Sequence, residues 1–393
     1  MERIYLDNSA TTPLDPAVLE AMMPYLTDDF GNASSIHTFG QTAKMAVDRA
    51  RHQVAALLNA TRPNEIIFTS GGTESNNLAI RGLVEANSRH GNHIILSAIQ
   101  HPAVESVCED LEKKGFELTV LPVYENGIVK IEDVRAAIRD DTILITVMAA
   151  NNEIGTLQPI NEIGSLVRDL RRPGKKIWFH TDAVQAVGKI RVDVEEIGCD
   201  LLSFSGHKIN GPKGVGGLYV RRGVRLHTQN IGGRQERGTR AGTENVPGIV
   251  GLGSAAELAG STLDDLDTRI RSFRDRIEND ILERVPDAIP NGDRTTRLPN
   301  IANISFRSIE GEALLIALDM QGIAVSTGSA CSSGSLEPSP VIRALGHGDA
   351  VARGAIRFSL GRQNTAEEID KLLELLPSSV ARLRSLQPTA KHA

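Results

Sequence analysis

The 393-residue sequence has few cysteines, no excess of basic residues and no long apolar run. Its three cysteines, Cys108, Cys199 and Cys331, form neither a CxxC pair nor a Cys/His cluster. This argues against a metal site and against a disulfide framework. Such a sparse, odd set fits a reducing compartment, although one of the three could be a reactive thiol. The net charge of −6 gives no reason to expect nucleic acid or an anionic membrane as a partner.

Several other signals are also missing. No apolar run approaches the roughly 18 to 20 residues that a membrane span needs. The first residues lack the basic and apolar regions of a secretory signal, so we expect a cytoplasmic protein with no membrane partner. The chain contains no HExxH, no GxSxG and no Gly-Lys-Ser/Thr loop ending, which argues against a zincin, a serine hydrolase and a P-loop nucleotide enzyme.

The first two-thirds of the chain alternate short apolar runs with segments of helical periodicity. The apolar runs are residues 65–70, 93–97, 142–148, 176–180 and 200–204, and the helical segments are 74–86, 103–114, 131–139 and 160–170. This alternation predicts an α/β fold with a mostly parallel sheet covered on both faces. In such sheets, functional residues lie at the carboxyl ends of the strands.

The pattern changes near residue 254, where a charged amphipathic stretch at 263–285 begins a mixed region. Short strands at 303–306, 323–326 and 355–358 and helices at 312–320 and 366–376 predict a smaller α+β domain. Pro377 should end or kink the last helix, with a turn or two beyond it. Because the length exceeds what one core usually serves, we predict a large domain at 16–255 and a small domain built from 1–15 and 256–393.

Polar residues follow several of the predicted strands. After the first, Ser70–Asn77 opens a helix, so Gly72 and Thr73 could form a phosphate cradle, or simply a capped tight turn. His101 follows the next strand and is either a site residue or a helix cap. Asp182 and Gln185 follow a later strand, where the same two interpretations apply.

Lys208 ends the segment Ser203–Lys208, which follows another predicted strand. Apolar residues and glycine around a lysine lower its pKa, which favours the neutral amine that forms an imine, whereas the alternative is a solvated loop lysine. Each of these signals is weak alone. In one order along one sheet, a phosphate cradle, a ring-stacking histidine, an aspartate for a pyridinium nitrogen and an imine-forming lysine are the parts that pyridoxal 5'-phosphate (PLP) requires.

The sequence resembles the cysteine desulfurases of the class V aminotransferase family, in particular the iron–sulfur-cluster type. The resemblance extends from Tyr5 to Arg362, and the matching segments are Tyr5–Thr12, Gly31–His37, Thr69–Asn77, Asn151–Gly155, Ser205–Lys208, Arg240–Thr243, Gly328–Cys331 and Ile356–Arg362. It implies PLP fold type I, with a mostly parallel seven-stranded sheet in the large domain and a smaller α+β C-terminal domain.

The resemblance also implies the roles of residues around the cofactor. Lys208 would form the Schiff base with PLP and then move protons. His101 would stack on the ring and serve in proton transfer. The remaining cofactor contacts would be Asp182 at the pyridine nitrogen, Gln185 at the ring hydroxyl oxygen, Asn152 near cofactor and substrate, and Gly72, Thr73, Ser205 and His207 at the phosphate.

Two further groups of residues follow from the same resemblance. Arg357 would bind the carboxylate of the substrate L-cysteine, helped by Asn32 and Asn152. Thr243 would reach the phosphate of a neighbouring protomer, which implies a homodimer with shared sites.

Cys331 lies in a segment rich in glycine and serine, not on an apolar face, although burial as a small apolar residue is the alternative. By resemblance its thiolate attacks the sulfur of the substrate, giving a Cys331 persulfide and L-alanine. The sulfur would pass to an acceptor protein such as an iron–sulfur scaffold, or serve thiocofactor or tRNA thiolation. A selenocysteine or cystine lyase of the same family, and a catalytically idle scaffold subunit, are the alternatives.

Overall fold

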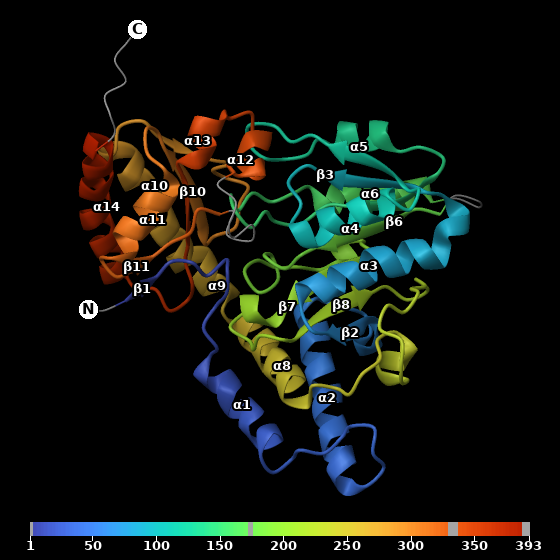
Figure 1. Ribbon diagram of the computed structural model, residues 1–393. Coiled ribbons are helices and arrows are strands. Elements are labelled where there is room, and N and C mark those ends of the chain that lie inside the picture. Colours follow the sequence, from blue (N-terminus) through green and yellow to red (C-terminus); the bar gives the residue numbers. More distant parts are fainter. Residues whose placement is uncertain (1–2, 172–175, 329–336, 387–393) are drawn as a thin grey trace.

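The computed structural model describes residues 3–171, 176–328 and 337–386. Its largest sheet has seven strands in the order β2–β8–β7–β6–β5–β3–β4 (Figure 1). Neighbours from β7 through β6, β5 and β3 to β4 are parallel, whereas β8 is antiparallel to both β7 and β2. The predicted mostly parallel seven-stranded sheet is therefore confirmed. Its strands are β2 (Ile66–Thr69), β3 (His93–Ser97), β4 (Glu117–Leu121), β5 (Thr142–Thr146), β6 (Trp178–Asp182), β7 (Leu201–Ser205) and β8 (Gly216–Val220).

Helices cover both faces of this sheet. On β3, Ile94 and Leu96 join an apolar cluster with α3 (Gly72–Asn87) and α4 (Pro102–Glu112). Ile95, which points to the other face, joins a larger cluster that contains residues of α2, α6 and α8. Burial on both faces explains why these strands appear in the sequence as continuous apolar runs.

The remaining helices of this part include α1 and α2, which pack against α8. The contact between α2 and α8 is close, since a Cβ added at Gly253 would lie 2.6 Å from the Cα of Ala50. The helices are α1 (Pro16–Leu26), α2 (Thr38–Leu57), α5 (Ile131–Ala137), α6 (Ile160–Leu170), α7 (Val194–Ile197) and α8 (Val246–Ser261), with short 3₁₀ turns η1 (Pro63–Glu65), η2 (Ser88–His90), η3 (Gly206–Lys208) and η4 (Gln235–Gly238).

The C-terminal part has a separate core. Strands β10 (Ile301–Phe306), β12 (Ala355–Ser359) and β9 (Ala288–Pro290) form an antiparallel sheet, and β1 (Ile4–Tyr5) pairs in parallel with β11 (Ile323–Ala324). Their apolar side chains form one cluster that joins both ends of the chain. The helices here are α9 (Leu263–Asp265), the π-helical η5 (Leu266–Ile270), α10 (Arg271–Arg284), α11 (Gly311–Asp319), α12 (Pro340–Ala344), α13 (Asp349–Arg353) and α14 (Ala366–Leu386).

We propose that this cluster is the core of the predicted small domain; the boundaries 1–15, 16–255 and 256–393 stay a prediction. Helix α14 differs from expectation, because it continues through Pro377 to Leu386. Leu376 and Val380, on either side of the proline, are both buried, and their packing offsets the lost backbone hydrogen bond. Among the described residues, no helix has the length and apolar character needed to cross a membrane.

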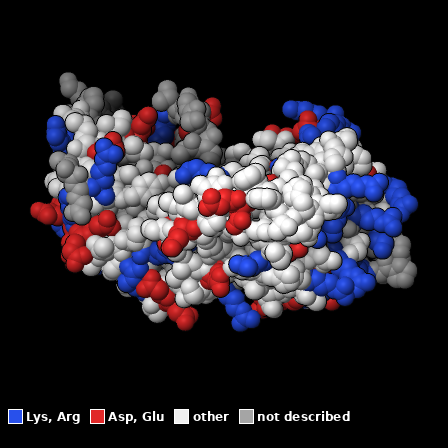
Figure 2. All heavy atoms as spheres, turned by 90° about the horizontal axis from the view of Figure 1, so that it is seen from below, with Lys and Arg blue, Asp and Glu red and all other residues white. Residues whose placement is uncertain are grey.

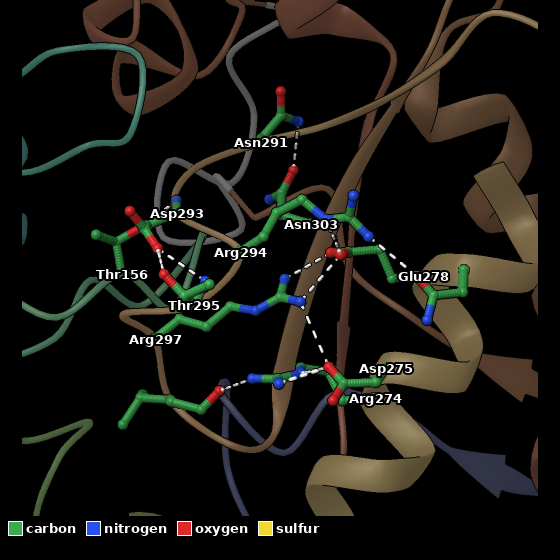
Figure 3. A network of polar contacts seen from close by, with 12 residues as sticks. Thr156, Arg274, Asp275, Glu278, Asn291, Asp293, Arg294, Thr295, Arg297 and Asn303 are labelled. Atoms are coloured by element: carbon green, nitrogen blue, oxygen red, sulfur yellow. Dashed lines mark hydrogen bonds and ion pairs between the residues drawn. The ribbon is translucent and has the colours of Figure 1, made fainter.

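A buried ionic network fastens α10 to the segment at 291–300 (Figure 3). Arg297 donates to both carboxylate oxygens of Glu278, at 2.5 and 2.9 Å, and both side chains are almost fully buried. The same segment contacts the turn after β5: the Oγ of Thr156 accepts a hydrogen bond from the Asp293 backbone at 3.1 Å, and Leu298 donates to the Gly155 carbonyl. The network therefore fixes the position of the 291–300 segment, against which residues 151–157 pack.

Candidate active site

A cavity of about 300 Å³ lies at the carboxyl ends of the parallel strands and extends to β12. Such a position is usual for ligand sites in α/β sheets, and the volume suits a small cofactor. Most of the residues predicted from the sequence line this cavity: Gly72, Thr73, His101, Asn152, Asp182, Gln185, Ser205, His207, Lys208 and Arg357.

Lys208 ends the 3₁₀ turn that directly follows β7. Its Nζ atom donates to the backbone carbonyls of Ser9 and Ala10, at 2.5 and 2.7 Å. The amine is therefore held inside the site by the N-terminal segment, and the interpretation of Lys208 as a solvated loop lysine is wrong.

Asp182, the last residue of β6, is buried and accepts two hydrogen bonds. They come from Asn76 Nδ2 at 2.7 Å and from the Val184 backbone at 3.0 Å. Two residues earlier on the strand, the imidazole of His180 lies between Thr146 and Ser203 hydroxyls, at 2.8 and 3.0 Å. Burial lowers the pKa of His180 to about 3, so this ring is neutral and adds no positive charge near Asp182.

The start of α3 forms one wall of the cavity. Gly71, at φ 153°, takes a conformation that side-chain-bearing residues rarely adopt, and a Cβ placed there would point toward the Ser205 Oγ, 3.8 Å away. That hydroxyl is buried and has no hydrogen-bond partner in the described structure. Free amides at a helix start, beside Thr73 and an unused hydroxyl, form a site that suits an anion such as a phosphate.

Both cavity histidines have defined partners. His101 caps α4, because its Nδ1 accepts from the Ala103 backbone at 3.1 Å. In the neutral ring this leaves the proton on Nε2, and the same side chain that caps the helix also lines the cavity. His207 contacts the Thr11 hydroxyl at 3.1 Å, and burial together with the charges of nearby lysines, Lys208 first, lowers its pKa to about 4.

Arg357 lies in β12 with its side chain buried. Its two terminal nitrogens donate to the Asp7 carboxylate at 2.7 Å and to the Asn152 carbonyl at 2.9 Å. Its Nε is buried without a partner among the described residues. A guanidinium has five N–H groups. The Nε–H group and the terminal N–H groups that do not bind Asp7 or Asn152 therefore remain for an anionic ligand.

The cavity fits PLP in both charge and donor set. The helix start and the Ser205 hydroxyl suit its phosphate, and the Asp182 carboxylate suits its pyridinium nitrogen. The primary amine of Lys208 lies in the same cavity, where an aldehyde group can react with it. PLP, once bound, supplies an electron sink for bond breaking next to the amino group of an amino acid.

Two of the predicted site residues that the structure describes are not brought into this cavity. Asn32 is exposed and its Oδ1 accepts a hydrogen bond from the Ser34 backbone at 2.9 Å, while Thr243 is exposed in the segment before α8. Cys331 lies outside the described residues.

Sequence reasoning missed several residues that the structure places around the site. Asn76 donates a hydrogen bond to Asp182, and Asp7 accepts one from Arg357. The Ser9 carbonyl accepts one from Lys208. Glu153 is buried and accepts a hydrogen bond from the Ser339 hydroxyl at 2.6 Å, and burial raises its pKa. Lys189 is buried next to Gln185. Asp7, Ser9, Asn76 and Glu153 stand inside the segments Tyr5–Thr12, Thr69–Asn77 and Asn151–Gly155, which were already singled out, but their partners are distant in sequence.

Comparison with known proteins agrees with this site. The Aminotransferase class-V family model matches residues 4–372. Cysteine desulfurase IscS of Methanosarcina thermophila is 51% identical over 385 residues, which cover 98% of this chain and 94% of that protein. A cysteine desulfurase of Nostoc sp. is 52% identical over 388 residues, covering 99% and 95% of the two chains.

Solved structures give the same result for the fold. A NifS-like protein superposes with a TM-score of 0.90 at 37% identity, covering 97% of this chain and all of that one (100%). SspA in complex with cysteine has a TM-score of 0.80 at 37% identity, covering 91% and 98%. These matches confirm PLP fold type I. Because the family model and the relatives span nearly its whole length, the chain belongs to the class-V aminotransferases and, among them, to the PLP-dependent cysteine desulfurases.

Proposed function

We propose that the protein converts L-cysteine to L-alanine and transfers the sulfur, as a persulfide on Cys331, to an acceptor protein for iron–sulfur cluster assembly. The observation that carries the proposal is the single cavity that contains Lys208, Asp182, His101 and Arg357. A solved relative, SspA, has been observed with cysteine bound, which supports the choice of substrate.

Each of these residues has a defined part in the proposal. Asp182 would hold the pyridine nitrogen of bound PLP in its protonated form, and PLP would supply the electron sink. Lys208 takes the proton from the α carbon of the substrate and returns one later, and His101, with its proton on Nε2, assists proton transfer. Six further residues would bind and orient the cofactor: Asn152, Gln185, Gly72, Thr73, Ser205 and His207.

Arg357 binds the substrate carboxylate through the N–H groups that Asp7 and Asn152 leave unused. The fork of a guanidinium fits a carboxylate with two parallel hydrogen bonds, which a lysine ammonium cannot reproduce. Asp7 fixes the plane of the guanidinium and therefore the direction of the fork.

Replacing Arg357 with lysine should raise the KM for L-cysteine about ten- to a hundredfold, because losing hydrogen bonds to a charged group costs about 1.5–3 kcal/mol. The measurement is steady-state alanine formation, with the visible band of bound PLP as a check that the cofactor stays. Arg353→Lys, at an exposed arginine on α13, is the matched control. An unchanged KM in Arg357→Lys would show that the carboxylate binds elsewhere.

The other two cysteines are poor nucleophiles, which supports Cys331 as the sulfur acceptor. Cys108 and Cys199 are buried and free, and burial raises the pKa of the Cys108 thiol to about 12 and that of Cys199 likewise above its usual value. In the proposed step the Cys331 thiolate attacks the substrate sulfur. A sulfur–sulfur bond forms, and the carbon–sulfur bond breaks with its electron pair left on the carbon skeleton. A proton then completes alanine.

A homodimer is part of the proposal. Large apolar side chains are exposed on α1, on α2 and in the connection between them, a region that projects from the sheet (Figure 1): Leu19, Met23, Leu26, Phe30, Ile36, Phe39 and Met45. Ile36 is 94% exposed and Phe30 is 71% exposed, which is unusual for a monomer surface. Asn32 lies in the same connection, so a second protomer covering this region would also cover Asn32. The role predicted for Thr243, at the phosphate of a neighbouring protomer, requires such a dimer.

Sedimentation equilibrium should give about twice the chain mass of 42.3 kDa. Replacing Phe30 with aspartate should lower that mass, because a buried carboxylate opposes the contact. A wild-type protein that sediments as a monomer at micromolar concentration would exclude the shared site.

The acceptor and the location complete the proposal. Acidic and basic side chains are interspersed over much of the face in Figure 2, with Lys and Arg gathered toward one end. A cytoplasmic location agrees with the two described cysteines being free.

Rates on L-cysteine, selenocysteine and cystine decide between the desulfurase and the lyase alternatives. We expect alanine from L-cysteine at the highest kcat/KM. A preference for either of the other two substrates by tenfold or more would favour the corresponding lyase.

A further inference from the structure

A second lysine is buried next to the site. Lys189 lies in the turns after β6 and is 6% exposed. In the described part of the chain it forms no ion pair with a carboxylate. Its Nζ atom donates instead to the Oε1 of Gln185 at 3.0 Å and to the Gln185 carbonyl at 3.3 Å. Burying an amine in this way is costly, so a neutral side chain would serve stability better.

The contacts of Lys189 continue to the reactive amine. Gln185 Nε2 donates to the Ser9 carbonyl at 2.9 Å, and the Lys208 Nζ donates to the same carbonyl at 2.5 Å. These contacts fix the orientation of the Gln185 amide, because Oε1 must face the donor Lys189 and Nε2 must face the acceptor Ser9. The amide has a second N–H, for which the described residues offer no partner, and Gln185 lines the cavity.

The surroundings of Lys189 are cationic. Burial, followed by the charges of Lys208 and Arg357, lowers its pKa to about 7. Arg362 and Lys208 line a small cavity of about 30 Å³ together with Lys189. Arg357 and Arg362 have carboxylate partners in Asp7 and Asp15, and His207 is the other titratable group that interacts with Lys189.

We propose that Lys189 is a positioning residue for the cofactor site: its amine fixes the amide of Gln185 with an N–H group available to the ring oxygen of PLP. This deepens the proposed function and rests on PLP being the ligand of the cavity. Without Lys189, only the Ser9 carbonyl among the described residues holds the amide, so the amide rotates more freely and can present its oxygen to the ring oxygen, which would repel it.

Lys189→Met removes the donor while preserving length and apolar bulk. We expect the dissociation constant of PLP, measured by spectral titration of apoprotein, to rise about tenfold, the value of one lost hydrogen bond. Lys189→Arg, which restores a donor, should recover part of the affinity. Lys113→Met, at an exposed lysine at the end of α4, should leave the affinity unchanged.

A double-mutant cycle separates positioning from mere structural support. Gln185→Ala should weaken PLP binding by itself, and adding Lys189→Met to it should cause no further loss, because there is no amide left to orient. If the two losses multiply, or if Lys189→Met binds PLP as tightly as wild type, the proposal is wrong. Since PLP binding is read without cysteine, this result does not depend on which reaction the protein catalyses.

The pH dependence of unfolding checks that Lys189 is buried as described. The unfolded lysine has a pKa near 10.4, so between about 7 and 10 the unfolded chain binds more protons at this residue. The wild-type apoprotein should therefore gain thermal stability relative to Lys189→Met as the pH rises from about 7 to 9. A difference between the two melting temperatures that stays constant over this range would contradict the buried amine on which the proposal depends.

Discussion

Replacing Lys208 with alanine is expected to lower alanine formation from L-cysteine by about a thousandfold or more. In the proposed function the side chain has two tasks, since it would attach PLP and move the proton of the substrate α carbon. Its position supports both, because the amine lies inside the cavity and is held by the Ser9 and Ala10 carbonyls. The visible absorption of lysine-bound PLP should disappear with the activity.

Two variants make this result specific. Lys208→Arg retains the positive charge but cannot form an imine, so it should be as inactive as Lys208→Ala. Lys213→Ala, at an exposed lysine five residues further along, should retain both the visible band and the rate. A Lys208→Arg protein with near wild-type activity would exclude covalent attachment at this residue.

Replacing Cys331 with alanine should abolish the persulfide and lower alanine formation by about a hundredfold or more, because the nucleophile for the substrate sulfur is lost. The visible band of bound PLP should remain, since none of the described residues that line the cavity is changed. Activity and colour would thus separate in Cys331→Ala, whereas both are lost in Lys208→Ala.

Cys108→Ala is the matched control for a cysteine that is buried and whose pKa is raised to about 12. It should cost some stability through the cavity it leaves, but it should retain sulfur transfer. Persulfide formation in Cys331→Ala at the wild-type level would show that another residue is the nucleophile.

The sheet and most of the cavity could be predicted because both leave local signals in the sequence. Strands buried on both faces appear as short apolar runs, and the polar residues at which they end, such as Asp182 and Ser205, lie at the carboxyl edge of the sheet. Strand β4 left no such signal. It lies at the edge of the sheet and its residues Glu117 and Val120 are exposed.

Residues that act through distant partners could not be predicted in the same way. Asp7 and Arg357 are 350 positions apart, and Asn76 and Asp182 are 106 apart. The pairing exists only once β12 is placed beside the N-terminal segment. Lys189 is the clearest case, because nothing in the sequence around it indicates that its amine is buried against Gln185. The continuation of α14 through Pro377 likewise depends on tertiary packing against the apolar cluster of the C-terminal part.

In the proposed reaction the sulfur of L-cysteine is transferred to Cys331, and the carbon skeleton is released as alanine. Mass spectrometry of the PLP-loaded protein after exposure to L-cysteine, with alanine measured in the same sample, tests both halves together. We predict one added sulfur atom on the peptide that contains Cys331 and alanine in an equal amount in the first turnover. Free sulfide and pyruvate, with the Cys331 peptide unmodified, would contradict the account.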